Sequence, residues 1–156
     1  MMRAMIAPTE PPTPPAGAPP AAVDGLILLA HGARDPTWAT PFERVAARVR
    51  VACPQATVTL AFLESMTPDL PQAGAALAAA GCRHVVVLPL FLGTGGHVRR
   101  DVPARLAALA AAHPAVRWTL APAIGDDERL VQALAAIALQ HLGGGPLSRT
   151  LHDHQL

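Results

Sequence analysis

Apolar residues recur along this chain in four short runs rich in valine, isoleucine and leucine, separated by longer alanine- and leucine-rich stretches of helical period. Such runs are typical of buried strands, and their alternation with helices is typical of a parallel α/β sheet. With right-handed crossovers we expect a flavodoxin-like, three-layer fold with strand order 2-1-3-4 and a switch point between the first and third strands. The predicted strands span residues 23–30, 57–63, 84–90 and 116–120.

The first two predicted helices begin with a capping residue followed by proline. Asp35 precedes Pro36, and Thr67 precedes Pro68 in the same arrangement. A short polar N-cap side chain accepts hydrogen bonds from free N–H groups, and proline is tolerated at the next position. Both helices are therefore expected to begin where the preceding strands end, and Gly81 is the expected C′ residue of the second helix.

The remaining two helices are predicted from apolar periodicity. The third is expected to begin near Asp101, with Pro103 in its first turn. It carries Val102, Leu106 and Leu109 on one face.

The fourth helix is expected to begin around Asp126 and to end before Gly143. Asp127 and Glu128 are favourable there, because the first turn of a helix is the positive end of its dipole.

The organisation of the 156-residue chain is one domain with two extensions. Residues 1–22 contain seven prolines and are predicted to be a disordered leader, the domain spans 23–142, and 143–156 is predicted to be a flexible tail. The leader lacks the apolar stretch of a secretory signal, and charges and prolines interrupt every apolar run, so we expect a cytoplasmic protein without a membrane span.

Composition narrows the function classes. A net charge of +1 and 3% aromatic residues do not favour nucleic acid as a partner. The twelve basic residues are all arginine, so a P-loop lysine and a Schiff-base lysine are both excluded. Cys53 and Cys82 lie far apart and lack a CxxC pattern, and we interpret them as small buried residues.

Candidate metal ligands follow three of the predicted strands. His31 follows the first strand, Glu64 the second, and His97 the third after a short loop. Because parallel strands end at one edge of the sheet, the three side chains are expected to converge there. Two imidazoles and a carboxylate suit divalent iron, cobalt, nickel or zinc and leave coordination positions open. Taken singly, each could instead be an ordinary polar loop residue.

The loop before His97 is rich in glycine, from Gly93 through Thr94 and Gly95 to Gly96. Glycines allow close approach of a ligand to the backbone and can turn N–H groups toward anions, although a flexible connection would also account for them. Guanidinium groups that could bind ligand carboxylates follow or face this loop, or are simply solvated charges: Arg34, Arg99 and Arg100.

Other candidate residues are interpreted as structural. Trp38 and Phe42, four positions apart on a predicted helix, are expected to pack together. Five further histidines are assigned to structure, to the surface or to a His-x-His tail that could bind stray metal: His84, His113, His141, His152 and His154.

Three segments of the chain resemble the CbiX family of short, single-domain sirohydrochlorin chelatases of cobalamin and sirohaem biosynthesis. The residues that carry the resemblance are His31 to Pro36, Ala61 to Glu64, and Pro89 to Val98, in order and at matching separations within residues 23 to about 142. The proline-rich leader has no counterpart in this pattern.

The resemblance implies an ATP-independent (class II) chelatase that inserts a divalent metal, chiefly cobalt, into the polycarboxylated tetrapyrrole sirohydrochlorin. It also implies a homodimer and no permanently bound cofactor, with the metal as a substrate. By the same resemblance His31 is the proton acceptor and a metal ligand, His97 a second ligand, and Glu64 a contact to metal or substrate. The loop formed by Leu92, Gly93, Thr94, Gly95, Gly96 and His97 would bind the tetrapyrrole.

Other functions fit part of this pattern. Ligand type does not separate a cobaltochelatase from a sirohydrochlorin ferrochelatase or a nickelchelatase. A non-catalytic carrier of metal or tetrapyrrole would use the same ligands. A flavodoxin-like signalling or nucleotide module is less favoured, because its acidic cluster or phosphate-binding signature is not evident.

Overall fold

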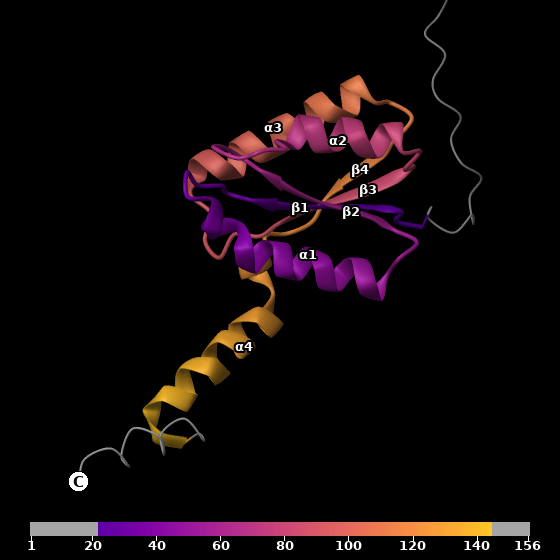
Figure 1. Cartoon of the computed structure of the whole chain (residues 1–156). Helices are drawn as coiled ribbons and strands as arrows, with labels where there is room; N and C mark the ends of the chain where they lie inside the picture. Colours follow the sequence, from indigo (N-terminus) through magenta and orange to yellow (C-terminus); the bar gives the residue numbers. More distant parts are fainter. Residues whose placement is uncertain (1–21, 145–156) are drawn as a thin grey trace, which may run out of the picture.

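A four-stranded parallel sheet forms the centre of the protein (Figure 1). The computed structural model describes residues 22–144. Strand order is β2-β1-β3-β4, with every neighbouring pair parallel, as the sequence predicts. Each strand lies within about two residues of its predicted range. The strands are β1 (Gly25–Ala30), β2 (Thr57–Phe62), β3 (His84–Pro89) and β4 (Arg117–Leu120).

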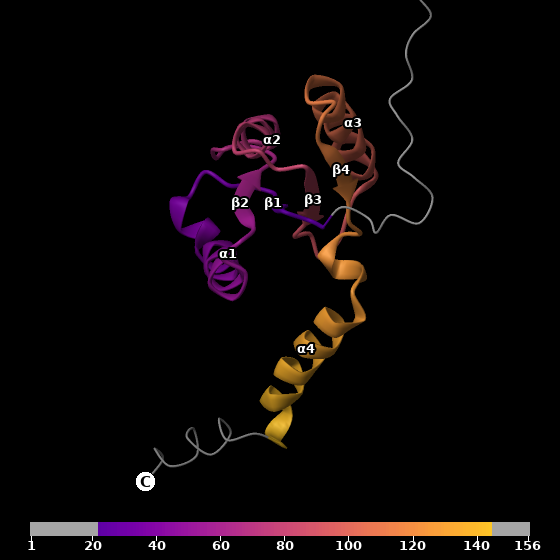
Figure 2. The ribbon, with the colours of Figure 1, turned by 90° about the vertical axis from the view of Figure 1, so that its right-hand side faces the viewer.

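The helices cover the two faces of the sheet unequally (Figures 1 and 2). Helices α2 (Leu70–Ala79) and α3 (Gly96–Ala112) lie on one face, and α1 (Thr40–Ala52) lies on the other. Helix α4 (Glu128–Leu139) points away from the sheet. Three short helical segments complete the described chain: η1 (Pro36–Ala39), η2 (Ile124–Asp126) and η3 (Gln140–Gly144).

Alternate residues of the strands contribute side chains to two apolar cores, one on each face of the sheet, because successive side chains of a strand point to opposite faces. On the α2/α3 side, Ile27 and Leu29 pack with Val85 and Val87, and all four are fully buried. On the α1 side, Leu28 of β1 packs against other buried side chains, among them Ala46, Leu60 and Phe62. The ends of β1, β2 and β3 are thereby fixed relative to one another.

Most residues interpreted as structural are packed as expected. The rings of Trp38 and Phe42 lie 4.8 Å apart between centroids. His84 is buried, with Nε2 2.9 Å from Oγ1 of Thr119. Cys82 is buried as predicted, whereas Cys53 is only half-buried and departs from the prediction; both are free thiols.

Asp35 is a helix N-cap as predicted, but the helix that it caps is the short segment η1, which precedes α1. Asp35 accepts a hydrogen bond from the Thr37 N–H at 2.9 Å, and Pro36 opens the short segment η1 before α1 begins. Gly81 has a φ of +88° directly after the second helix, as its predicted role requires.

The predicted start of the second helix is wrong by two residues. Asp69, rather than Thr67, is the N-cap of α2. Asp69 accepts from the Gln72 N–H at 2.8 Å, and the Gln72 side chain accepts from the Asp69 N–H at 2.9 Å, which forms a capping box. Two reciprocal bonds outweigh the single bond that Thr67 could supply. The Thr67–Pro68 peptide is cis and lies in the preceding loop.

The predicted start of the third helix is also wrong, because α3 begins at Gly96 rather than near Asp101. Pro103 therefore lies inside the helix, where its ring removes one backbone donor without ending the helix. The predicted apolar face is confirmed, since Val102, Leu106 and Leu109 are all buried.

The fourth helix begins within two residues of its predicted start and is capped by Asp127. No residue of α4 is buried, so this predicted helix does not form part of a layer on the sheet. In the described chain, no helix is both long and apolar enough to cross a membrane. Residues 1–21 and 145–156 lie outside the described residues, and with them nearly all of the predicted leader, most of the predicted tail, and His152 and His154.

Candidate functional site

The ends of β1 and β2 bring two of the predicted ligands together. Nε2 of His31 lies 3.5 Å from Oε1 of Glu64, and the side chains are 51% and 63% exposed. Both groups are therefore open to a ligand from solvent. An imidazole and a carboxylate at this distance can bind the same cation.

Backbone pairing beyond the strands fixes this arrangement. The Leu63 N–H donates to the Ala30 carbonyl at 3.0 Å, and the Glu64 N–H donates to the His31 carbonyl at 3.1 Å. Gly32 has a φ of +92°, and a Cβ at this position would lie 1.9 Å from the Glu64 carbonyl oxygen. Only glycine allows the two loops to approach so closely.

His31 is one of the residues that line an open cavity of about 490 Å³. Phe91 is buried just after β3, and its ring forms a T-shaped pair with the imidazole, with centroids 6.2 Å apart. Most of the wall is apolar and comes from several elements far apart in sequence: Phe42, Val45, Leu90, Leu92, Ile124 and Leu130. A large, mostly apolar ligand with a polar centre would therefore be suited to this side of the imidazole.

His97 stands apart from that pair. It is exposed in the first turn of α3, which follows β3 and so begins at the same edge of the sheet. Across residues 22–144, no three His, Cys, Asp or Glu side chains are grouped closely enough to hold a metal ion. The structure thus joins His31 and Glu64, whereas a shared site with His97 stays a prediction.

The predicted tetrapyrrole loop, from Leu92 to His97, is open to solvent on its glycine side. A Cβ added at Gly93 or Gly95 would meet nothing within 4 Å. Gly95 is the N-cap of α3 and supplies no side-chain hydrogen bond, so N–H groups of the first turn are available to an anion. Leu92 is 66% exposed.

The arginines near this loop differ in their contacts. Arg99 donates from Nε to Oγ1 of Thr94 at 3.1 Å, and Arg100 donates from Nε to the Gly96 carbonyl at 3.1 Å. Arg34 is exposed across the sheet edge and lines a shallow depression with Ser65 and neighbouring residues. Two of the three guanidinium groups therefore help to shape the loop and its helix.

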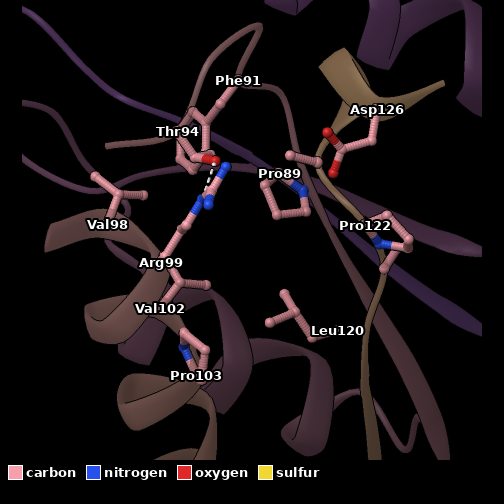
Figure 3. A pocket seen from close by; sticks show the side chains of 12 residues that line it. Pro89, Phe91, Thr94, Val98, Arg99, Val102, Pro103, Leu120, Pro122 and Asp126 are labelled. Carbon is pink, nitrogen blue, oxygen red and sulfur yellow. Dashed lines mark hydrogen bonds between the residues drawn. The ribbon is translucent and has the colours of Figure 1, made fainter. Parts of the chain in front are cut away.

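A second cavity, of about 230 Å³, lies between the start of α3 and the end of β4 (Figure 3). Arg99 stands on one wall and Asp126 on the other, with Leu120 and Pro122 among the apolar residues between them. Asp126 and the residues after β4 are not among the site residues predicted from the sequence. Their position could have identified them as candidates for the site, because β4 ends at the same edge of the sheet as the other strands.

The sequence of this chain matches a family model and is similar to several known proteins. The CbiX family model matches residues 25–140. A sirohydrochlorin cobaltochelatase of Saccharolobus solfataricus is 32% identical over 117 residues, which covers 70% of this chain and 89% of that protein. A sirohydrochlorin ferrochelatase of Bacillus subtilis is 33% identical over 75 residues, which covers 48% of this chain and 29% of that protein.

A solved structure has the same fold. The crystal structure of a protein from Marinobacter aquaeolei VT8, described as a cobalamin (vitamin B12) biosynthesis CbiX protein, is 34% identical with a TM-score of 0.68. The superposition covers 76% of this chain and 96% of that one. The described domain therefore corresponds to nearly the whole of that protein.

Proposed function

Because the chain belongs to the CbiX family, whose model spans residues 25–140, we propose that it inserts a divalent metal into sirohydrochlorin without ATP. Cobalt is the proposed metal, since the S. solfataricus relative is a sirohydrochlorin cobaltochelatase. One observation carries the proposal: an exposed imidazole and carboxylate 3.5 Å apart, beside a mostly apolar cavity. The proposed pathway is cobalamin biosynthesis.

His31 is the proposed catalytic base. Metal insertion removes two protons from the pyrrole nitrogens, and imidazole accepts protons readily at neutral pH. Glu64, at 3.5 Å from Nε2, stabilises the imidazolium that forms. The exposure of both groups allows each proton to pass to solvent before the next is taken.

The same pair is the proposed entry site for the metal, which is a substrate and not a resident cofactor. An imidazole and a carboxylate bind divalent cobalt, iron or nickel and leave other coordination positions free. His97 is the proposed third ligand, contributed from the start of α3. A site with so few protein ligands can release its ion to the four nitrogens of the ring.

The loop from Leu92 to His97 is the proposed binding segment for the tetrapyrrole. Its exposed glycines let a flat ring approach the backbone, and the free N–H groups of α3 can bind carboxylates at the ring edge. Arg99 lies beside this loop and can pair with another carboxylate. The apolar wall around His31 would contact the face of the ring.

Iron and nickel are the alternative metals. Of these two alternatives, iron is supported by one specific observation, the 33% identity to a B. subtilis sirohydrochlorin ferrochelatase. A competition assay that offers cobalt, iron and nickel together with sirohydrochlorin would identify the preferred ion from the absorption spectrum of the product.

A non-catalytic carrier is the alternative from another class, because exposed ligands also suit metal transfer. Turnover distinguishes the two: an enzyme yields many metallated rings per chain, whereas a carrier yields at most one. Multiple turnover without ATP is the expected result. Stoichiometric binding with no gain in insertion rate would overturn the enzymatic proposal. We also propose that the protein acts in the cytoplasm as a homodimer.

A further inference from the structure

Arg105 joins two segments that carry proposed metal ligands. It lies on α3, the helix whose first turn contains His97, and its Nη1 donates to the Leu63 carbonyl at 3.4 Å. Leu63 directly precedes Glu64. Helix α3 contacts β4 at one edge of the sheet, whereas Leu63 follows β2 at the other edge (Figure 2). A single side chain therefore connects the helix that bears His97 to the segment that bears Glu64.

The peptide unit that accepts this bond is held on both sides. The carbonyl and N–H of a trans peptide point in opposite directions. Here the carbonyl of Leu63 accepts from Arg105, and the N–H of Glu64 donates to the His31 carbonyl at 3.1 Å. Gly32 also packs tightly against the Glu64 carbonyl. The contacts that place His31 beside Glu64 thus do not involve α3, and the bond from Arg105 connects α3 to a pair that is already in place.

Asp101 holds the guanidinium of Arg105 from within α3. Nε of Arg105 lies 2.9 Å from Oδ2 of Asp101, and both side chains are 38% exposed. The two residues are four apart, so their side chains are neighbours on one face of the helix. With Nε bound to the carboxylate, Nη1 is directed toward the Leu63 carbonyl. Partly buried ion pairs are screened by salt less than exposed ones, so the pair persists at physiological ionic strength.

Pro103 lies between these two residues and interrupts the backbone bonding of α3. Proline has no N–H, so the Arg99 carbonyl four residues earlier lacks its usual helical donor. The turn that contains His97 is therefore joined to the rest of α3 by one backbone bond fewer than in an uninterrupted helix. The ion pair of Asp101 with Arg105 spans Pro103 and connects the turns on either side of it.

We propose that Arg105 is a positioning residue that sets the distance between His97 and the His31–Glu64 pair. The role requires no contact with metal or tetrapyrrole, because Arg105 fixes the start of α3 against the segment that bears Glu64. Distances from metals to their protein ligands stay within about 0.2 Å of their ideal values, so a small displacement of α3 removes His97 from the coordination sphere. The inference rests on the proposed function, since it takes His97 as the third metal ligand.

Arg105→Met tests this role with little change in packing. Methionine keeps a long, unbranched side chain at the half-buried position but donates no hydrogen bond. We expect the Kd for cobalt, measured by isothermal titration without tetrapyrrole, to rise about tenfold. Arg117→Met, at an exposed position on β4, is the matched control and should leave this Kd unchanged. Arg105→Lys keeps the charge beside Asp101 but lacks the forked guanidinium, and an intermediate Kd is expected.

A double-mutant cycle with His97→Ala separates positioning from a general loss of structure. In the His97→Ala background, Arg105→Met has no third ligand left to displace, so it should raise the Kd for cobalt less than about twofold. An equal rise in both backgrounds would overturn the proposal, because Arg105 would then act without His97. A Kd for cobalt that His97→Ala itself leaves unchanged would also overturn it.

Two further measurements keep the outcome unambiguous. Circular dichroism shows whether each variant is folded during titration, and Arg105→Lys replaces Arg105→Met in the cycle if the methionine variant unfolds. The titrations use cobalt alone and do not depend on metal insertion. A protein that shows the expected cycle but does not metallate sirohydrochlorin would refute only the chelatase proposal. A protein that inserts cobalt while the two substitutions act additively would refute only the role of Arg105.

Discussion

Nε2 of His31 and Oε1 of Glu64 lie 3.5 Å apart because β1 and β2 are adjacent parallel strands that end in register. The last pair of the ladder is Ala30 with Phe62, and backbone bonds continue the pairing to the next residues. A base and its carboxylate partner are thus positioned by the sheet itself, although they are distant in sequence. The site depends on the backbone of two loops as much as on its two side chains.

Removing the charge of Glu64 tests its part in this pair. Glu64→Gln keeps the shape of the side chain but no longer stabilises an imidazolium or binds a cation strongly. We expect metal affinity to fall about 10- to 100-fold, as is usual when a partner of a metal-binding histidine is changed. Isothermal titration of cobalt measures this. Glu43→Gln, an exposed change on α1, is the control, and equal affinities for the two variants would contradict the role of Glu64.

Gly32→Ala is expected to destabilise the fold at the site. The added Cβ would lie 1.9 Å from the Glu64 carbonyl oxygen, in a backbone with a φ of +92°. Gly81→Ala is a matched control, because its φ is +88° but a Cβ there meets nothing within 4 Å. Left-handed backbone costs about 1–2 kcal/mol for alanine, and the clash adds to this only at Gly32. If Gly32→Ala and Gly81→Ala lower the free energy of unfolding in urea by the same amount, the loops at Gly32 and Glu64 can move apart without cost, which would contradict this prediction.

Asp24 is expected to make stability depend on acid pH. Partial burial raises the pKa of its carboxyl, but bonds from the backbone N–H groups of Arg83 and His84 outweigh this, and the net pKa is lowered. The stabilisation is therefore present above the ordinary pKa of 3.8 and is lost as the pH falls below it. Asp24→Asn should cost about 1 kcal/mol in urea unfolding at pH 7, and much less at pH 3. An equal cost at both pH values would contradict this.

Arg99 is expected to contribute to binding of the tetrapyrrole more than to the chemical step. It holds Thr94 in the proposed binding loop through a 3.1 Å bond and can face a ring carboxylate. Arg99→Ala should raise KM for sirohydrochlorin about tenfold while kcat changes little, as expected for the loss of one charge-assisted hydrogen bond. Arg48→Ala, on the exposed surface of α1, is the control. A fall in kcat at constant KM would assign Arg99 to the reaction instead.

The features that sequence predicted well are those set by local pattern and by the rules of parallel sheets. Apolar runs gave the four strands, and the ends of neighbouring strands placed His31 beside Glu64. Helix starts were harder where two capping signals competed. Thr67 with Pro68 has the expected form, but the reciprocal bonds of Asp69 and Gln72 determine where α2 begins.

Two features depend on information that a local pattern does not contain. The position of His97 follows from the start of α3 at Gly96, five residues before the predicted start near Asp101, so the distance from His97 to the other ligands was not predictable from strand ends. The apolar side chains exposed along α4 indicate that the helix buries one face, but not against which surface. Both questions depend on tertiary and quaternary structure.

The rate of cobalt insertion by His31→Ala tests the central claim most directly. Purified protein, cobalt and sirohydrochlorin are mixed without ATP, and the absorption change of the tetrapyrrole is followed for the natural sequence, for His31→Ala and for the distant control His113→Ala. General base catalysis by His31 predicts a fall of at least about 100-fold for His31→Ala and a nearly unchanged rate for the control. Equal rates for the natural sequence and His31→Ala would contradict the account.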